Sequence, residues 1–506
     1  MYVPNRWSVG ISPESEVVAA APRRYRTDIK RVGVQYDTFG YGGAERVAAE
    51  LVKIYVELGY EVCLYTNVPA AAGDNVLPDC VERKVAPSCN DDHEARFAFW
   101  QAEVENGLDA CIYNSWVSGW AQFDCWSLKS LGVQFIFYTH STFASWFRDP
   151  IADYLARALP WIAARADAVV AINGVTADFF SLYSKKVMQL VNPVDQYLAS
   201  VPVSEYSGTG QNILWVGRIS DEKRPYEAVQ IMAQVCKTHP EAHMDVLGGN
   251  PDPDRHEPER IARYASEVLG LTNNQITFHD FSDPFPFYGK ADVYLQTSEC
   301  EGFALTLAEA MRFGLPCVTY DLSYLTLLES GEGALMAPIG DIKAAARRIE
   351  SILDDDATRA ATSKAALRTY DAVCRVDVAA MWRAILAELP SGSLPADLLH
   401  SPDHEASSSI MRLVLEQVGI AACDARREHH ALEKAEARIS QLQAEAAESR
   451  EKIDRLRSEL AGTRAVLACT RRERDDACSS LSAIRGSRSF KLAEAIAAPY
   501  RRLKNR

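Results

Sequence analysis

Short apolar runs alternate with helix-length segments along most of this chain. The run at 32–36 is followed by a Gly-rich turn at 40–43, a helical pattern over 44–58 and a second run at 62–66. Apolar residues spaced three and four apart indicate a helix, and short apolar runs indicate strands. This order predicts a strand–helix–strand unit with parallel strands and a right-handed crossover.

The alternation continues and then starts again after a polar stretch at 204–211. The further predicted strands lie at 110–113, 134–138, 168–172, 213–216, 243–247, 275–278, 293–295 and 317–319. Strands that alternate with helices favour open, doubly wound parallel sheets. The first 400 residues therefore predict an α/β fold with two domains in series.

The C-terminal part has a different pattern. Residues 389–409 are rich in Pro, Ser and His, which is typical of a linker. With Leu432 as position a of a heptad, twelve of the sixteen a and d positions up to Ile484 are apolar. This predicts a coiled coil, most simply between copies of this chain, and hence a homo-oligomer through 432–484. A single solvated helix rich in Ala, Glu and Arg is the alternative.

Charge is distributed unevenly along the chain. The net charge is −14, yet residues 485–506 hold seven basic side chains and one acid, Glu494. The negative net charge of the whole chain argues against a nucleic-acid-binding protein, so no nucleic-acid partner is expected. Apolar residues at helical steps in the basic end fit an anionic membrane surface. A solvated or disordered end is the alternative.

Composition and cysteine usage narrow the class of protein. The chain has 506 residues, 48% of them apolar and 24% charged, which is typical of a globular protein. Its twelve cysteines include no Cys-x-x-Cys pair, so zinc-ribbon and thioredoxin-like sites have no support. Scattered thiols, no signal-like run and no 18-residue apolar run favour a cytoplasmic protein, peripheral at most on the inner membrane's cytoplasmic face.

The most informative segment runs from Ser298 to Val318. It follows the predicted strand 293–295 and consists of a turn at 301–303 and a helix over 304–312. Ligands usually bind where strands of a parallel sheet end. Free amides at the start of the helix suit a phosphate or another anion.

Two carboxylates, Glu301 and Glu309, flank the start of that helix eight residues apart. This spacing corresponds to about 12 Å along a helix, beyond the roughly 5–10 Å of a glycosidase pair. It fits two carboxylates that hold opposite ends of an elongated ligand through its hydroxyls. The alternative is an ordinary helix N-terminal acid.

A second candidate segment leaves the predicted strand 213–216. Arg218 and Lys223 follow this strand. Two cations at such an edge can neutralise a diphosphate and stabilise the charge that develops when it departs. Individually, an Arg and a Lys at the surface are ordinary.

Five segments in this order resemble family 4 glycosyltransferases, which have the GT-B fold of two Rossmann-like domains facing a cleft. The resemblance covers about residues 30–388. The segments are Gly42-Gly-Ala-Glu-Arg-Val47, Tyr138-Thr-His-Ser141, Val191-Asn-Pro-Val-Asp195, Val216-Gly-Arg218 with Lys223, and Glu301-Gly-Phe with Glu309-Ala-Met before Gly314-x-Pro316.

The resemblance implies a role for each matching position. Arg218 and Lys223 would hold the donor's pyrophosphate, Glu309 the ribose hydroxyls and Glu301 the sugar hydroxyls. His140 would reach the donor sugar from the N-terminal domain. The implied catalytic set is Glu301, His140, Arg218 and Lys223; the implied donor-binding set is Gly42, Gly43, Gly217, Arg218, Lys223, Glu301, Gly302, Phe303, Ala304, Leu305 and Glu309. Family members are generally retaining transferases that need no bound metal, so neither a metal nor a cofactor is expected.

Some positions depart from the family's pattern. Ala304 stands where the family usually has a second Gly, and Gly is the residue that tolerates unusual backbone angles. The segment 192–195 lacks a Gly often found there. Asp252-Pro-Asp254 matches the metal-binding Asp-x-Asp of another transferase fold, but its Pro and Asp neighbours indicate an ordinary turn.

These observations predict a retaining glycosyltransferase that moves a sugar from a UDP- or GDP-sugar to a hydroxyl of a glycan or lipid-linked saccharide. The setting would be bacterial surface polysaccharide synthesis. An inactive GT-B body serving as a coiled-coil scaffold is the alternative. The expected divisions are 1–27 a loose extension, 28–203 the acceptor-side domain, 204–388 the donor domain, 389–423 a linker with a short helix, 424–484 the coiled coil and 485–506 the basic amphipathic tail.

Overall fold

A computed structural model of the chain describes residues 28–401, except 41, 72–75, 89–92, 115–117, 144–151, 195–197, 199–209, 249–256 and 281. Residues 28–142 and 157–401 belong to one compact unit, which carries both sheets. Residues 143 and 152–156 are assigned to a second unit. The predicted coiled coil, the basic tail, Asp195 and the Asp252-Pro-Asp254 turn lie outside the described residues.

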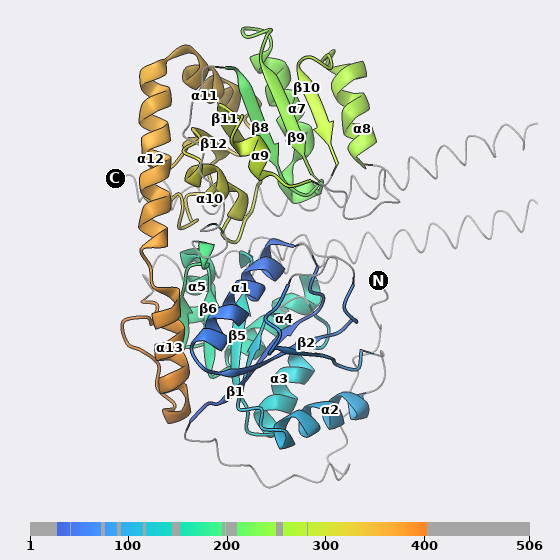
Figure 1. The fold of residues 1–506 in the computed structure, drawn as a ribbon, viewed down its shortest axis with the longest axis vertical. Coiled ribbons are helices and arrows are strands. Elements are labelled where there is room, and N and C mark those ends of the chain that lie inside the picture. Colours follow the sequence, from blue (N-terminus) through green and yellow to red (C-terminus); the bar gives the residue numbers. More distant parts are fainter. Residues whose placement is uncertain are drawn as a thin grey trace, which may run out of the picture. The chain divides into compact units, whose positions relative to one another are not determined.

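Two parallel sheets confirm the predicted α/β architecture (Figure 1). The first sheet contains β1 (Arg31–Tyr36), β2 (Glu61–Thr66), β3 (Glu82–Val85), β4 (Ala110–Tyr113), β5 (Gln134–Thr139), β6 (Ala168–Ala171) and β7 (Val187–Gln189). The second contains β8 (Asn212–Val216), β9 (His243–Leu247), β10 (Ile276–His279), β11 (Val293–Gln296), β12 (Cys317–Tyr320) and β13 (Leu335–Ala337).

Helices connect these strands, as the alternating pattern predicts. The first sheet is joined by α1 (Gly43–Glu57), α2 (His93–Glu105), α3 (Ala121–Ser130), α4 (Ala152–Ala163) and α5 (Gly174–Ser181). The second is joined by α7 (Pro225–Val235), α8 (Glu257–Arg263), α9 (Phe285–Tyr288) and α10 (Leu305–Arg312), and is followed by α11 (Ile342–Asp354), α12 (Asp356–Cys374) and α13 (Val378–Glu388). Residues 28–194 are called the N-terminal lobe below, and residues 210–374 the C-terminal lobe.

Both sheets share one topology. Their orders are β3-β2-β1-β4-β5-β6-β7 and β10-β9-β8-β11-β12-β13. In each sheet the chain moves outward in one direction, returns past its first strand and then moves outward in the other. Between β1 and β4, and between β8 and β11, the connections leave in opposite directions, which is where ligands bind in such folds.

The three strands that the apolar pattern did not predict all lie at sheet edges. β3, β7 and β13 have three or four residues each, and β3 reads Glu-Arg-Lys-Val. An edge strand has a single hydrogen-bonded neighbour and needs no continuous apolar run. Pairing with β2, β6 or β12 therefore decides its conformation more than its own sequence does.

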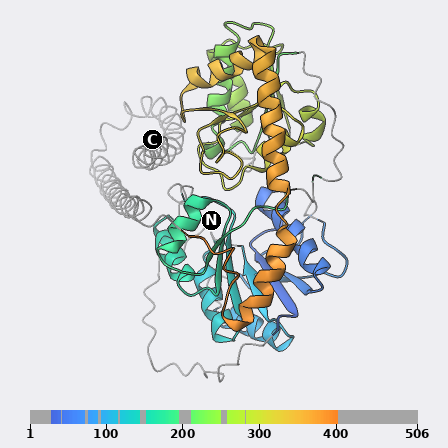
Figure 2. The ribbon, with the colours of Figure 1, turned by 90° about the vertical axis from the view of Figure 1, so that its left-hand side faces the viewer.

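Helix α13 packs against the N-terminal lobe, although the sequence places it within the range 204–388 of the donor domain. Trp382 is fully buried, and its ring centroid lies 5.2 Å from that of Tyr55 on α1 and 5.8 Å from that of Tyr138 on β5. Figure 2 shows α13 against the first sheet's lobe and α12 against the second. We therefore propose that residues 376–401 are part of the N-terminal structural domain.

The segment after α13 also attaches to this lobe, within the part expected as a linker. The His400 amide donates to the Val187 carbonyl oxygen at 2.8 Å, and His400 Nε2 lies 2.6 Å from Asp178 Oδ1. Leu399 forms an antiparallel bridge with Met188 of β7. These bonds occupy part of the open edge of the first sheet.

No helix within the described ranges combines the length and the apolar character that crossing a membrane requires.

Replacing Trp382 with Ala tests how strongly α13 is attached. Removing a large buried side chain typically costs about 3–5 kcal/mol in the free energy of unfolding. Arg383→Ala, at the exposed neighbouring position, should change it by less than about 0.5 kcal/mol. Urea unfolding followed by circular dichroism measures both. Equal, small effects would show that α13 contributes little to the stability of the lobe.

Candidate functional site

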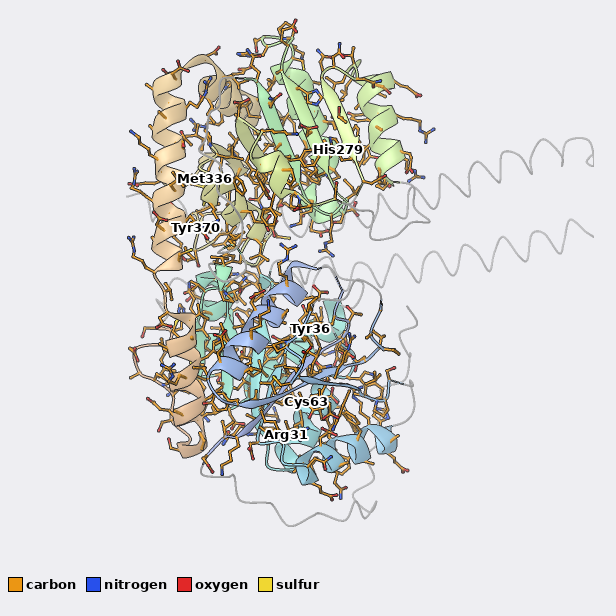
Figure 3. The ribbon with its side chains drawn as sticks, in the orientation of Figure 1. Arg31, Tyr36, Cys63, His279, Met336 and Tyr370 are labelled. Carbon is orange, nitrogen blue, oxygen red and sulfur yellow. The ribbon has the colours of Figure 1, made fainter. Side chains whose placement is uncertain are left out.

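The residues singled out from the sequence lie where strands of the two sheets end. Gly42 caps α1 after β1, and His140 follows β5 directly. Arg218 and Lys223 follow β8, and residues 301–304 join β11 to α10. Figure 3 labels Arg31 and Tyr36 at the two ends of β1, so that the Tyr36 end marks the carboxyl edge of the first sheet.

The two motifs of the C-terminal lobe meet at one ion pair. Lys223 Nζ donates to Glu301 Oε1, and Gln296 Nε2 donates to the same oxygen at 3.0 Å. Because β8 and β11 are neighbours in the sheet, the loops that leave them lie side by side. The structure thus brings together one of the predicted phosphate-binding cations and the predicted sugar-binding carboxylate.

The backbone of Glu301 is held by a residue that the sequence did not point out. The Tyr324 hydroxyl accepts a hydrogen bond from the Glu301 amide at 3.0 Å and donates to the Glu301 carbonyl oxygen at 3.2 Å. Tyr324 comes from the loop between β12 and β13. No motif links positions 301 and 324, so only the fold could reveal this contact.

Arg218 lies apart from the Lys223–Glu301 pair. Its side chain is 65% exposed, and its Nη2 lies 3.2 Å from Glu222 Oε1. Burial pushes the pKa of Glu222 upward, but the Ser220 hydroxyl and the charges of Arg218 and Lys223 outweigh burial and leave this pKa below its usual value. The exposed guanidinium is therefore positioned by a carboxylate and can still reach a ligand.

Glu309 is buried and already has partners at both oxygens. Arg46 Nη1 donates to Oε1 at 3.0 Å, and the Tyr288 hydroxyl donates to Oε2 at 2.8 Å. The carboxylate side chain is only 2% exposed, whereas that of Arg46 is 39% exposed. Ribose hydroxyls at this carboxylate would have to share it with Arg46 or replace the guanidinium.

Glu45 and Arg46 on α1 each interact with a residue of the predicted donor-binding set. Arg46 binds Glu309, and the charge of Arg218 acts on Glu45. Burial raises the pKa of Glu45, and the Arg218 charge offsets part of that rise. In the sequence this dipeptide stands out only as part of a family motif, and its charge complementarity with Arg218 and Glu309 becomes visible only in the fold.

Glu301 and Glu309 each bind a different pair of side chains. Glu301 binds Lys223 and Gln296, whereas Glu309 binds Arg46 and Tyr288. This separation is consistent with two carboxylates that contact different parts of one ligand. The role of each remains a prediction.

His140 is held as a neutral imidazole. Burial lowers its pKa to about 3. Its Nε2 lies 2.7 Å from Asn114 Oδ1, and Nδ1 has no hydrogen-bond partner among the described residues. The Tyr138 ring centroid lies 4.2 Å from that of the imidazole. A neutral histidine can orient a hydroxyl without adding positive charge.

Gly302 brings the C-terminal lobe against the ends of β5 and β6. A Cβ atom at this position would lie 2.2 Å from the His140 carbonyl oxygen, which no side chain can tolerate. Asn173 lies just after β6, and its Nδ2 donates to the Gly302 carbonyl oxygen at 3.0 Å. The glycine of the Glu-Gly-Phe turn is therefore required by a close backbone approach.

Gly43 and Leu305 also come close to each other. A Cβ atom at Gly43 would lie 3.3 Å from Leu305 Cδ1, a tight contact. Gly43 is the first residue of α1, and Leu305 is the first residue of α10. The predicted donor-binding glycines thus face the start of the C-terminal lobe's site helix, with Phe303 buried beside it.

Two non-glycine residues among those described have positive φ, and both cap helices at this site. Ala304 has φ 69° as the N-cap of α10, and Arg224 has φ 48° as the N-cap of α7. The left-handed region costs a residue with a Cβ atom about 1–2 kcal/mol. Such strain accumulates at functional sites, where the surrounding structure imposes it.

Within the described ranges, no group of three or more His, Cys, Asp or Glu side chains could hold a metal ion.

Two family models match the chain. Residues 41–196 match "Glycosyltransferase Family 4", and residues 203–369 match "Glycosyl transferases group 1". The chain is 26% identical over 199 residues to poly(glycerol-phosphate) alpha-glucosyltransferase from Bacillus subtilis, which covers 39% of this chain and 28% of that protein. The matched part of the chain spans about a third or less of the length of the curated relatives that it matches first.

Solved structures share the fold. Sucrose-phosphate synthase from Thermosynechococcus elongatus is 19% identical with a TM-score of 0.56, covering 70% of this chain and 97% of that one. HepE from Anabaena, in complex with UDP and glucose, is 15% identical with a TM-score of 0.54, covering 68% and 95%. At these identities the likeness shows the fold of two facing α/β domains.

Ala304→Gly should stabilise the protein. Glycine adopts positive φ without the steric cost, so the free energy of unfolding should rise by about 1 kcal/mol. The matched control is Ala308→Gly in the interior of the same helix, which should lower it by about 1 kcal/mol or more. Thermal unfolding measures both. A lower melting temperature for Ala304→Gly would contradict the strain assigned to this residue.

The low pKa of His140 predicts a specific loss of stability in acid. The unfolded chain takes up a proton near pH 6.5, whereas the folded protein does so only near pH 3. The free energy of unfolding therefore falls as pH drops below about 7, by about 1–2 kcal/mol from this residue between pH 7 and 5. Urea unfolding at both pH values should show a smaller fall for His140→Gln. Equal falls in both proteins would exclude a neutral His140 in the folded protein.

Proposed function

We propose that this chain, which belongs to the family 4 (group 1) glycosyltransferases, transfers a sugar from a nucleoside diphosphate donor to a hydroxyl group with retention at the anomeric carbon. The observation that carries the proposal is the Lys223–Glu301 ion pair. It joins a cation suited to a diphosphate to a carboxylate suited to sugar hydroxyls, at the ends of two neighbouring parallel strands.

Each group has one part in this reaction. Lys223 and Arg218 neutralise the diphosphate and stabilise the charge that develops as the bond from the anomeric carbon to the phosphate oxygen breaks. Glu309 binds the ribose, and Glu301 accepts hydrogen bonds from the sugar hydroxyls. The amides of residues 302–304 and the neutral His140 contact the sugar, together with Gly42, Gly43, Gly217 and Leu305 around the donor.

The proton and the new bond follow from retention. The acceptor hydroxyl attacks the anomeric carbon on the face that the diphosphate leaves, and its proton passes to the departing phosphate oxygen. No bound metal is part of this proposal, because Arg218 and Lys223 supply the positive charge. Exclusion of water by the two lobes would protect the donor from hydrolysis.

The proposed acceptor and setting rest on the names of similar proteins and on the sequence of the C-terminal part. The B. subtilis relative is named for glucosyl transfer to poly(glycerol-phosphate), and HepE was solved with UDP and glucose. These names favour a UDP-sugar donor and a surface-glycan or lipid-linked acceptor. We also propose self-association through 432–484 and contact of 485–506 with an anionic membrane at the cytoplasmic face, both from sequence alone.

An inactive body that serves as a scaffold is the second candidate. Ala304, a strained residue in place of the family's glycine, motivates it. Glu301, Glu309, Arg218 and Lys223 are nevertheless all present, and a pure scaffold would not require these charged side chains together.

Nucleotide binding and turnover test the proposal. UDP, GDP and ADP, and their common sugars, are screened by thermal shift with and without a chelator. A ligand at 100 times its Kd adds about 2.7 kcal/mol of stability. Lys223→Ala and Arg218→Ala should each lower the release of nucleoside diphosphate about 100-fold or more. Lys237→Ala, an exposed lysine of the same lobe, should leave it unchanged.

Two outcomes would contradict the proposal. Unchanged turnover in both Lys223→Ala and Arg218→Ala would remove the assigned phosphate site. A well-folded protein that neither binds nor turns over any of these nucleotides would favour the scaffold.

A further inference from the structure

Behind the Lys223–Glu301 pair lies a second ion pair with the same connectivity. Arg224 Nε donates to Glu299 Oε2, so two consecutive cations of one loop bind two carboxylates of the next. The Glu299 side chain is 1% exposed and that of Arg224 is 16% exposed, whereas Glu301 and Lys223 are 11% and 18% exposed. Of the two carboxylates, Glu299 in the second ion pair is therefore more deeply buried than Glu301.

Arg224 is engaged by several groups at once. Its Nη1 also donates to Glu227 on α7, and Glu227 in turn accepts from the Tyr320 hydroxyl at the end of β12. The guanidinium is thus held between two carboxylates from different elements. A side chain with these partners is suited to fixing the backbone that carries it rather than to binding the donor directly.

The backbone at Arg224 shows what this anchoring maintains. Its φ of 48° and ψ of 53° lie in the left-handed region, immediately before Pro225 and the start of α7. Any residue with a Cβ atom adopts this conformation at a cost. The two ion pairs of the side chain compensate for that cost, and the conformation sets the direction in which the preceding residue, Lys223, projects.

Further hydrogen bonds tie the two loops together around the same point. The Glu299 amide donates to the Glu222 carbonyl oxygen at 3.0 Å. The Thr297 hydroxyl donates to the Lys223 carbonyl oxygen at 2.7 Å and accepts from Trp215 Nε1 at 2.9 Å. Residues 222–224 and 297–301 therefore form one bonded unit, with Arg224–Glu299 on its buried side.

We propose that Arg224 and Glu299 are a positioning pair that fixes Lys223 against Glu301, so that the donor's diphosphate meets a preoriented cation. The inference rests on the proposed donor site. Arg224 acts through Lys223 and does not itself touch the donor. Its removal should therefore impair the departure of the diphosphate without unfolding the lobe.

The test is a double variant, Arg224→Gly with Glu299→Gln. Glycine accepts the positive φ, and glutamine avoids a buried unpaired charge. With a nucleotide sugar that the wild type turns over, kcat should fall about 10- to 100-fold, as expected when a reacting group is misplaced. The melting temperature should stay within a few degrees of the wild type. Arg368→Gly with Glu332→Gln, an exposed Arg–Glu pair of the same lobe, is the control and should leave kcat unchanged.

The decisive measurement repeats the double variant in a Lys223→Ala background. If the pair acts through Lys223, its loss should lower kcat by less than about threefold there, because residues that act as a unit are not additive. A full, additive loss in the Lys223→Ala background would show that Arg224 contacts the donor itself. An unchanged kcat of the double variant in the protein that retains Lys223 would show a merely structural pair. Either result overturns the proposal.

Two controls keep the outcomes distinct. If the double variant does not fold, Arg224→Lys keeps a positive charge but cannot form both contacts of the guanidinium, and kcat should fall at least about threefold with the melting temperature retained. An unchanged kcat in that variant would also overturn the proposal. A wild type that turns over no nucleotide sugar contradicts the proposed function, and the positioning role falls with it.

Discussion

The candidate site depends on the bonding between two loops that leave neighbouring strands of the second sheet. Lys223 and Arg224 on one loop bind Glu301 and Glu299 on the other, and backbone bonds at Glu222 and Thr297 reinforce them. A lysine at the surface would be mobile and strongly hydrated. Held against the Glu301 carboxylate, the Lys223 ammonium group has a fixed position. A charge fixed in advance can stabilise a departing anion without reorganisation.

The N-terminal lobe contributes groups that complement this site. Arg46 binds Glu309, Asn173 binds the Gly302 carbonyl, and the Gly302 backbone passes so close to the His140 carbonyl that only glycine fits. A long chain segment returns through α12 to α13, where Trp382 packs on Tyr55 and Tyr138. Tyr138 in turn lies beside His140, so the packing of α13 supports the histidine from behind.

Strain is concentrated at the same place as the candidate chemistry. Ala304 and Arg224 both take positive φ at the start of a helix, one on each of the two bonded loops. The surrounding contacts impose this conformation: α10 and the Glu-Gly-Phe turn for Ala304, and two carboxylates for Arg224. Ala304 departs from the family's pattern, and its positive φ explains why glycine is favoured at this position.

The interior strands of both sheets and the helices between them could be predicted from the sequence. These strands are buried on both faces, and such burial requires continuous apolar runs such as 110–113 and 134–138. The order of the motifs likewise indicated the family and the charged residues of the candidate site. Edge strands such as β3, the return of α13, and the partners Arg46, Gln296, Tyr288, Tyr324, Glu299 and Arg224 were decided by the tertiary structure alone. Their contacts join residues up to 263 positions apart, and an isolated polar side chain carries no periodic signal that shows which distant group it will meet.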